Sequence, residues 1–275
     1  MPSRRVGLIG CGTIGSQLAI AIDSGKVPNA TLVSLFDVVA ENAQSLQGRL
    51  EHRAEIFGDF DRFLQSEIDT IVEAASQQAV RSFANSALAS GKDLMVMSVG
   101  ALADPHFLTE LLDMAQKHST RIYIPSGAIA GIDAIRSVKN FIGTVTLTTT
   151  KHPKALAGAP FFAERGIKPE EIMQKTEIFT GPASEAVKLF PANVNVAAVL
   201  GLAGIGPAKT RVRIVADPNT KTNKHDISAS GSFGEIQISV DNVPSPGNPK
   251  TSYLAILSAI ECLRSICDDS IRIGT

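Results

Sequence analysis

Hydrophobic and polar residues alternate in two different ways along this chain. In residues 1–125, short apolar runs are followed by longer segments whose apolar positions recur every three or four residues. Short runs of this kind are typical of buried parallel strands, and the longer segments of the helices that connect them. The predicted strands are residues 5–9, 31–36, 56–57, 68–74, 93–97 and 121–124, and the predicted helices are residues 14–24, 41–50, 79–90 and 106–118.

After residue 125 the pattern changes. Three segments are rich in β-branched residues and alternate so that one face is polar, which predicts a mostly antiparallel sheet. The predicted strands are residues 145–150, 212–216 and 235–240, and the predicted helices between and around them are 129–141, 184–189 and 195–202.

The end of the chain returns to helix. Residues 244–249 contain three prolines and a glycine and are predicted to form a linker, and residues 252–267 carry an apolar stripe at helical spacing. We therefore expect an α/β protein. Residues 1–125, with 250–275, are expected to form an N-terminal Rossmann-type parallel-sheet domain. Residues 126–249 are expected to form a second α+β domain, and the C-terminal helix returns to the first domain.

Composition excludes several classes of protein. The 275 residues are 44% hydrophobic and 19% charged, which is globular rather than disordered. With 26 basic and 27 acidic residues, no positive field favours nucleic acid or an anionic membrane. Glycines interrupt the N-terminal apolar run, which argues against a signal peptide, and residues 194–205 are too short to span a membrane. Three cysteines form no disulfide framework and no metal motif, so we expect no metal site and a cytoplasmic location.

A glycine-rich loop follows the first predicted strand directly. In the sequence GCGTIG of residues 10–15, Gly10 permits a tight turn, Gly12 lets the backbone approach a pyrophosphate, and Gly15 lets helix and strand pack closely. The N-terminus of the next helix faces the phosphates. S-adenosylmethionine proteins also use glycine turns here, but the three-glycine spacing favours a dinucleotide. The candidate cofactor contacts in the loop are Gly10, Gly12, Thr13, Ile14 and Gly15.

Asp37 ends the second predicted strand, where a carboxylate binds the adenosine ribose hydroxyls and repels a 2′-phosphate. Residues 38–40 contain no arginine for that phosphate, so NAD is predicted in preference to NADP. The alternative role for Asp37 is to cap the helix over 41–50. Ser76 and Gln77 follow the carboxyl end of the strand over 68–74, where ligands bind in open α/β sheets, and we place them near the nicotinamide ribose. The alternative role for Ser76 is an N-cap.

Four further motifs carry a resemblance to a known family. They are EAASQQAV at residues 73–80, PSGAIAG at 125–131, FPANVNVAA at 190–198 and NPKTSYL at 248–254. In this order and spacing they resemble the L-aspartate dehydrogenases over essentially the whole chain. The resemblance implies oxidation of L-aspartate to iminosuccinate with NAD, or alternatively NADP, as acceptor. Iminosuccinate then hydrolyses to oxaloacetate and ammonia or feeds the biosynthesis of NAD.

The resemblance also implies roles for single residues. The family's active-site histidine falls on His225, and its cofactor contacts fall on Ala128 and Asn195. Asn193 is the neighbouring alternative to Asn195, and we expect it to contact the substrate. Imidazole titrates near neutral pH, so it can accept the amine proton. Residues 219–226 form a polar run before a strand, which predicts an exposed loop. A solvated surface histidine is the alternative.

Aspartate has two carboxylates, which need cations or hydrogen-bond donors. Candidates for this role are Lys151, His152, Lys154, Lys250, Thr251 and Ser252. The family resemblance further implies a homodimer formed through the sheet of the second domain. Two other functions remain open at this point. One is a related two-domain oxidoreductase acting on another small acid or sugar, and the other is an NAD-binding sensor without catalysis.

Overall fold

The computed structural model describes residues 3–191, 195–246, 248–268, 270–271 and 273–274. It divides the chain into two compact units. The first unit comprises Met1–Ala101, Pro105–Pro125 and Ile256–Ile273, and the second comprises Leu102–Asp104, Ser126–Ala255 and Gly274–Thr275. Residues 250–255, which we expected in the first domain, therefore belong to the second unit.

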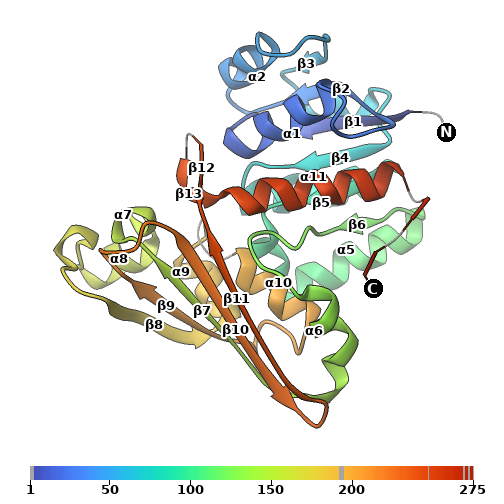
Figure 1. The fold of residues 1–275 in the computed structure, drawn as a ribbon. Coiled ribbons are helices and arrows are strands. Elements are labelled where there is room, and N and C mark those ends of the chain that lie inside the picture. Colours follow the sequence, from blue (N-terminus) through green and yellow to red (C-terminus); the bar gives the residue numbers. More distant parts are fainter. Residues whose placement is uncertain (1–2, 192–194, 247, 269, 272, 275) are drawn as a thin grey trace. The chain divides into compact units, whose positions relative to one another are not determined.

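The first unit contains a six-stranded parallel sheet with the strand order β3-β2-β1-β4-β5-β6 (Figure 1). The order reverses at β1, as in a doubly wound sheet, so the predicted Rossmann-type architecture is confirmed. The strands are β1 (Arg4–Ile9), β2 (Ala30–Phe36), β3 (Glu55–Phe57), β4 (Thr70–Glu73), β5 (Asp93–Val96) and β6 (Ile122–Tyr123).

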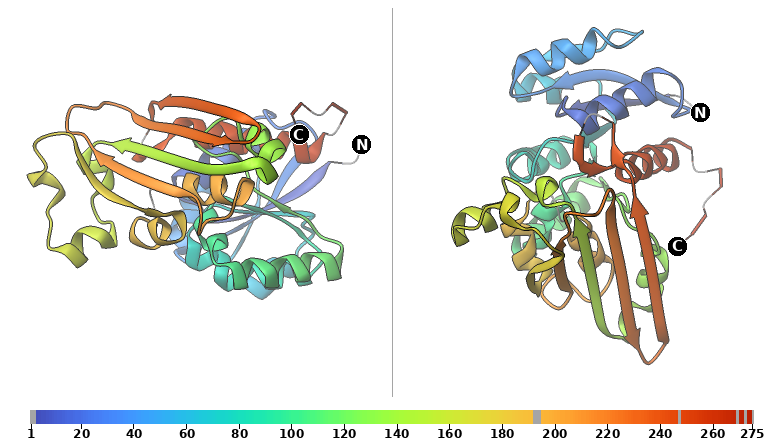
Figure 2. Two further views of the ribbon diagram at one scale, coloured as in Figure 1. Left: turned by 90° about the horizontal axis from the view of Figure 1, so that it is seen from below. Right: turned by 60° about the vertical axis from the view of Figure 1, so that its left-hand side comes forward.

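Helices cover both faces of this sheet (Figure 2). On one face, a single hydrophobic cluster joins Val6 of β1, Leu18 of α1 and Leu263 of α11, so the C-terminal helix packs on the first sheet as predicted. The helices of this face are α1 (Thr13–Asp23), α2 (Ala40–Gln47) and α11 (Tyr253–Cys267), and those of the other face include α4 (Gln77–Ala89) and α5 (Pro105–His118). The short helix α3 (Phe60–Gln65) adds Phe63 to a group of aromatic rings with Phe36.

The second unit contains a five-stranded sheet in the order β11-β10-β7-β9-β8. Only β7 and β9 run parallel, and the other pairs are antiparallel, which confirms the predicted sheet type. The strands are β7 (Ile142–Lys151), β8 (Thr176–Pro182), β9 (Arg211–Ala216), β10 (Asn223–Gly231) and β11 (Gly234–Asn242). Two of these strands, β8 and β10, were not predicted, because one contains glycine and proline and the other is largely polar.

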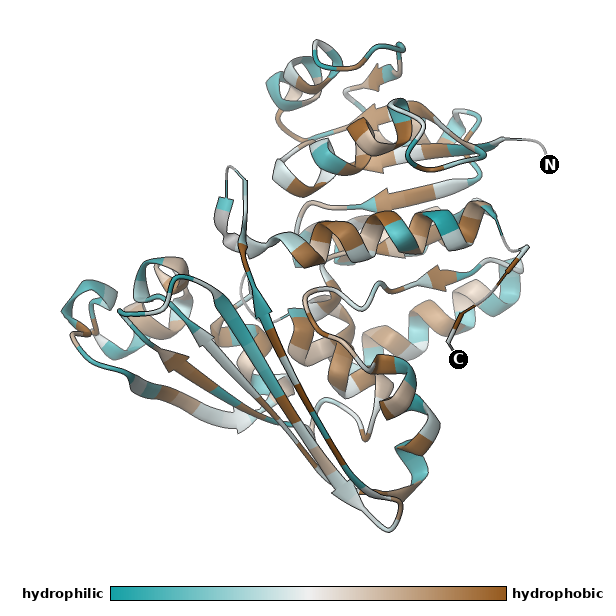
Figure 3. Cartoon of the chain, viewed as in Figure 1, coloured by the Kyte–Doolittle hydropathy of each residue, from teal (hydrophilic) through white to brown (hydrophobic). Residues whose placement is uncertain are grey.

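One face of the second sheet is covered and the other is open. Along β7, Val145 and Leu147 are buried, whereas Thr144 and Thr146 are exposed or half-buried on the opposite face. Figure 3 shows the alternation of hydrophilic and hydrophobic residues along β11. The helices of this unit are α6 (Ile132–Val138), α7 (Pro153–Leu156), α8 (Pro160–Arg165), α9 (Ala183–Leu189) and α10 (Asn195–Ala203).

Two segments differ from the prediction. The expected linker over 244–249 forms a small antiparallel pair, β12 (Pro244–Ser245) with β13 (Asn248–Ser252). The helix expected over 129–141 is shorter, because Gly131 has a φ of 70° and α6 begins only at the next residue. None of the helices in the described part of the chain is long and apolar enough to cross a lipid bilayer.

Candidate active site

The glycine loop of the first unit has the geometry of a phosphate-binding turn. Gly10 has a φ of 91°, and a β-carbon at Gly15 would lie 1.9 Å from the carbonyl oxygen of Gly10, so both positions require glycine. A β-carbon at Gly12 would meet no atom within 4 Å, so ligand atoms have room to approach this backbone. Gly12 is the N-cap of α1 without a side-chain cap, and Thr13 and Ile14 open the helix, half-buried. These residues fit a dinucleotide pyrophosphate.

Asp37 connects this loop to the end of β2. Its Oδ2 accepts a hydrogen bond from the backbone N–H of Cys11 at 2.7 Å, and its Oδ1 accepts one from Val39 N–H at 2.9 Å. The N-cap of α2 is Val39, so Asp37 does not cap this helix. Burial, and to a smaller extent the Asp37 carboxylate, raises the pKa of Cys11 to about 12, so the thiol in the loop stays protonated.

Ser76 has the capping role that was its alternative interpretation. It is the N-cap of α4, and its Oγ accepts a hydrogen bond from Ala79 N–H at 3.1 Å. Ser76 is also exposed and Gln77 half-buried at the carboxyl end of β4, so capping and a ligand contact are compatible at this turn.

The Ser76 turn is held by a buried carboxylate that the sequence reasoning missed. Glu73, 1% exposed at the end of β4, accepts hydrogen bonds from Ala75 N–H at 2.8 Å and Ser76 N–H at 2.9 Å. Its two oxygens also accept from the N–H and the hydroxyl of Ser98 after β5. Burial raises the pKa of Glu73, and these four donors act in the opposite direction. One side chain therefore ties together the ends of β4 and β5.

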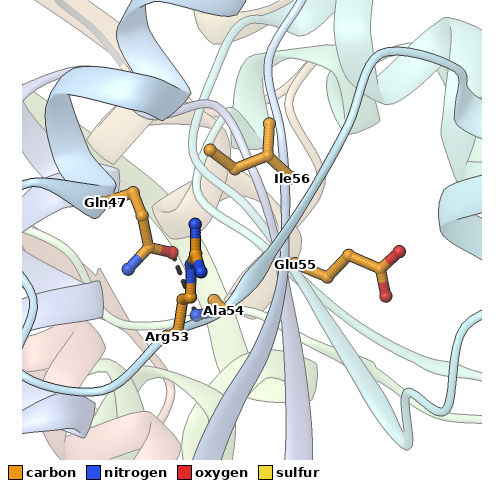
Figure 4. Close-up of a pocket in the computed structure, with 5 residues that line it drawn as sticks. All are labelled: Gln47, Arg53, Ala54, Glu55 and Ile56. Carbon is orange, nitrogen blue, oxygen red and sulfur yellow. Dashed lines mark hydrogen bonds between the residues drawn. The ribbon is translucent and has the colours of Figure 1, made fainter.

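A surface hollow of about 430 Å³ in the first unit lies away from these groups (Figure 4). There, Gln47 at the end of α2 accepts a hydrogen bond from Ala54 N–H at 2.9 Å, just before β3. The hollow is at the amino end of β3, whereas the glycine loop follows the carboxyl end of a parallel strand. It therefore lies at the opposite edge of the sheet from the nucleotide loop. The lining residues are Gln47, Arg53, Ala54, Glu55 and Ile56.

In the second unit, His225 lies inside strand β10 and is only 1% exposed. The expectation of an exposed loop before a strand was wrong, because β10 begins at Asn223 and the side chain of His225 points to the covered face. The Nδ1 atom of His225 lies 3.0 Å from the Oγ1 atom of Thr149 on β7. Burial, followed by the nearby charge of Lys151, lowers the pKa of His225 to about 3. The imidazole is therefore neutral at physiological pH.

Lys151 lies on the same covered face. It is the last residue of β7 and 3% exposed, and burial lowers its pKa to about 8. Because side chains two apart on a strand share a face, Lys151 and Thr149 point to the same side, as do Asn223 and His225. Thr149 pairs with His225 across the two strands. Four polar side chains thus share a face that elsewhere buries apolar residues.

A further asparagine connects this face to the predicted cofactor contacts. Asn242, paired with Asn223 and 4% exposed, donates its Nδ2 hydrogen bond to the carbonyl oxygen of Ala128 at 3.0 Å. A β-carbon on Gly127 would lie 3.8 Å from the Cγ1 atom of Val196, so the segment of Ala128 adjoins the start of α10. Asn195 is the first residue of α10. The chain segments that carry Ala128 and Asn195 therefore adjoin each other through Gly127 and Val196.

Of the residues predicted to contact the substrate carboxylates, only some lie near Lys151. Thr251 and Ser252 lie in β13, which contacts α7, the helix that starts just after Lys151. By contrast, His152 accepts a hydrogen bond at Nδ1 from Lys154 N–H as the N-cap of α7, and Lys154 is exposed. The backbone of Lys250 belongs to β13, but its side chain lies outside the described part, and so does the whole of Asn193.

The sequence reasoning missed Thr149, Asn223 and Asn242 as site residues. The signal was present as polar residues at alternate positions, Thr149 with Lys151 and Asn223 with His225. This alternation could not be interpreted from the sequence, because only the structure shows that the residues of β10 form a strand. Across the described ranges, no group of three or more histidine, cysteine, aspartate or glutamate side chains is arranged to hold a metal ion.

Comparisons with known proteins cover both units. A family model described as aspartate dehydrogenase, C-terminal, matches residues 133–266, and one described as homoserine dehydrogenase, NAD binding domain, matches residues 10–125. The L-aspartate dehydrogenase of Nitrosopumilus maritimus is 50% identical over 99% of this chain and 100% of its own. That of Methanosarcina barkeri is 48% identical over 98% and 99%. The crystal structure of aspartate dehydrogenase from Thermotoga maritima matches with a TM-score of 0.76 and 28% identity, over 100% of both chains.

Proposed function

This chain belongs to the L-aspartate dehydrogenase family, and on this premise we propose that it oxidises L-aspartate to iminosuccinate with NAD as the acceptor. The observation that carries the proposal is the 50% identity to an L-aspartate dehydrogenase along both entire chains. The covered polar face around His225 supports it, because a buried neutral imidazole suits the proton transfer that the reaction needs.

The first unit supplies the dinucleotide site in this proposal. The backbone of Gly12 and the first turn of α1 receive the pyrophosphate, and Asp37 binds the adenosine ribose. When bound, NAD accepts the hydride that leaves the Cα atom of aspartate. Ser76 and Gln77 contact the cofactor at the carboxyl end of β4, on the turn that Glu73 holds. The second unit adds Ala128 and Asn195 as cofactor contacts.

His225 handles the proton of the substrate amine. The Nδ1 atom of His225 lies 3.0 Å from the hydroxyl of Thr149. In the tautomer that donates Nδ1–H to this hydroxyl, Nε2 carries the lone pair that accepts the proton. A fixed ring orientation matters, because proton transfer requires the base within hydrogen-bond distance of the amine. In the protein without ligands, burial and then the positive charge of Lys151 keep the pKa of His225 low, so the imidazole is neutral.

The finer predictions from the sequence belong to the same proposal. Residues 1–125 with the C-terminal helix bind the dinucleotide, and residues 126–249 carry the substrate site. The open, threonine-rich face of the second sheet forms the interface of a homodimer, and the enzyme is cytoplasmic. Its iminosuccinate feeds the biosynthesis of NAD, and NADP serves as the weaker acceptor.

The test is direct. Purified protein is incubated with NAD and each of a panel of amino acids, and the formation of reduced cofactor is followed by its absorbance. We expect reduction with L-aspartate and none at a comparable rate with D-aspartate, L-alanine or L-glutamate. Reduction with other amino or hydroxy acids but not with L-aspartate would contradict the proposal.

A further inference from the structure

We propose that Lys151 and Asn223 together bind a carboxylate of the substrate beside His225. This inference rests on the proposed function, since it concerns how aspartate is recognised. It assigns the two residues as positioning and specificity residues.

The strand register places the two side chains side by side. Lys224 pairs with Thr150 and His225 with Thr149, so the antiparallel ladder continues with Asn223 opposite Lys151. Both residues occupy the covered face, where Lys151 is 3% exposed and Asn223 is 2% exposed. Lys151 ends β7 and Asn223 begins β10, so the pair lies at one end of the sheet, one step beyond the pair of Thr149 and His225.

Asn223, at the end of the sheet beside Lys151, offers a buried donor that a ligand would satisfy. Its Nδ2 atom is fully buried and has no hydrogen-bond partner within the described part of the chain. A buried amide donor that has given up water without gaining a partner is destabilising, and proteins keep such groups mainly where something else satisfies them. The neighbouring asparagine, Asn242, does have its Nδ2 partner in the carbonyl of Ala128.

The chemistry of the two groups selects an anion. The ammonium of Lys151 has three donors and no acceptor, and the Nδ2 of Asn223 is a donor, so both offer hydrogens to one ligand. A carboxylate has two oxygens that accept such bonds, and charge-assisted bonds of this type are the stronger ones. A neutral acceptor could take a hydrogen bond from either group but would gain nothing from the positive charge of Lys151, and a cation would be repelled by that charge. The pair of Lys151 and Asn223 therefore fits one carboxylate of a dicarboxylic amino acid.

Binding of the carboxylate would also prepare His225. Burial, and then the charge of Lys151, lowers the pKa of His225, and a bound carboxylate offsets the contribution of that charge. The imidazole then becomes more basic when substrate is present, which is when it must accept the amine proton. Recognition and proton transfer are coupled through the same lysine.

The experiment measures the binding of succinate, a dicarboxylate without an amine, by titration calorimetry in the presence of NAD. Lys151→Met should weaken succinate binding and raise the KM for aspartate by about 10–100-fold, with unchanged affinity for NADH. Asn223→Asp keeps the size of the side chain, removes the donor and repels a carboxylate, so it should weaken succinate binding at least as much. Lys188→Met, which alters an exposed lysine of α9, is the matched control and should behave as wild type.

Two outcomes distinguish this inference from the proposed function. If the wild type binds succinate and the Lys151 and Asn223 variants bind it equally well, these two residues do not bind the carboxylate, whatever the activity of the variants. If Lys151→Met does not fold, Asn223→Asp decides the question alone. Absence of turnover with aspartate in the wild type would contradict the proposed function instead, because succinate binding needs no turnover.

The KM values for aspartate and asparagine identify which carboxylate of aspartate Lys151 and Asn223 bind. If they bind the β-carboxylate, the wild type prefers aspartate and Lys151→Met loses this preference. If they bind the α-carboxylate, the variant weakens both substrates equally. Either result supports carboxylate binding by Lys151 and Asn223. A Lys151→Met variant with the wild-type KM for both substrates would overturn it.

Discussion

The hydroxyl of Thr149 lies 3.0 Å from Nδ1 of His225, and the two residues pair directly across strands β7 and β10. Thr149 is completely buried and His225 is 1% exposed. A hydrogen bond between two rigid strands fixes the plane of the imidazole ring, which a histidine on a loop would not achieve. The pair therefore determines which ring nitrogen is available to a substrate.

Replacing Thr149 by valine should test this orienting role. Valine has nearly the same shape but no hydroxyl, so the ring loses its partner while the packing remains. We expect kcat to fall about 10-fold, in line with the loss of one buried hydrogen bond, with little change in the affinity for NADH. The matched control is Thr148→Val on the opposite face of the same strand, which should keep the wild-type kcat. Equal rates for both variants would show that Thr149 does not orient the base.

His225→Ala should remove the proton acceptor itself. Positioned acid–base groups contribute about 10²–10⁴-fold, and turnover should fall by that factor. The affinity for NADH, measured by fluorescence titration, should change little, because the glycine loop and Asp37 belong to the first unit. His118→Ala, in the last turn of α5, serves as the control. Unchanged turnover in His225→Ala would exclude this residue from the mechanism.

The buried histidine should make the protein sensitive to acid. Burial, and then Lys151, lowers the pKa of His225 to about 3, against 6.5 for an ordinary histidine. Below pH 6.5 the unfolded chain therefore takes up a proton that the folded chain does not, and stability falls as the pH falls towards 3. The loss is about 1.4 kcal/mol per pH unit, or about 2 kcal/mol between pH 6.5 and 5.

Urea unfolding at the two pH values measures this effect. His225→Asn cannot take up the proton, so its free energy of unfolding should fall less than that of the wild type over the same interval. The difference between the two proteins isolates the histidine from the carboxylates that also titrate. Identical acid sensitivity in both would mean that His225 titrates normally in the folded protein.

Asp37 should determine the choice of dinucleotide. Its carboxylate repels a 2′-phosphate, and the neighbouring Val38, 82% exposed, offers no positive charge. We expect kcat/KM to favour NAD in the wild type and to shift towards NADP by at least about 10-fold in the double variant Asp37→Ser, Val38→Arg. Val38→Arg alone, which keeps the carboxylate, should still favour NAD. A wild-type enzyme that uses NADP equally well would contradict the prediction.

Much of the first unit was predictable because its signals are local. The strand of Val6 and Leu8, the glycine turn and the helix behind it follow one another within a few residues, so neighbouring residues alone set their conformation. The same is true of Ser76, whose capping bond spans three residues. The role of Glu73 was missed because its partner Ser98 lies after a different strand, β5, 25 residues along the chain.

The second unit was harder for a physical reason. Strand β10 has the sequence NKHDISASG, in which no apolar alternation indicates a strand. It is a strand because β7 and β11 on either side satisfy its backbone hydrogen bonds. Without those partners the same residues were interpreted as an exposed loop, and His225 was placed in water instead of in the covered face.

The amino-acid sequence by itself determined most elements of the first unit and their order, the dinucleotide turn and, through the resemblance to the family, the histidine. The elements and the turn follow from periodicity and from short-range stereochemistry. Only the tertiary structure decided that Thr149, Lys151, Asn223 and Asn242 share a face with that histidine. Strand pairing joins residues more than seventy positions apart, such as Thr149 and His225, and the register of each pair decides which side chains lose water together.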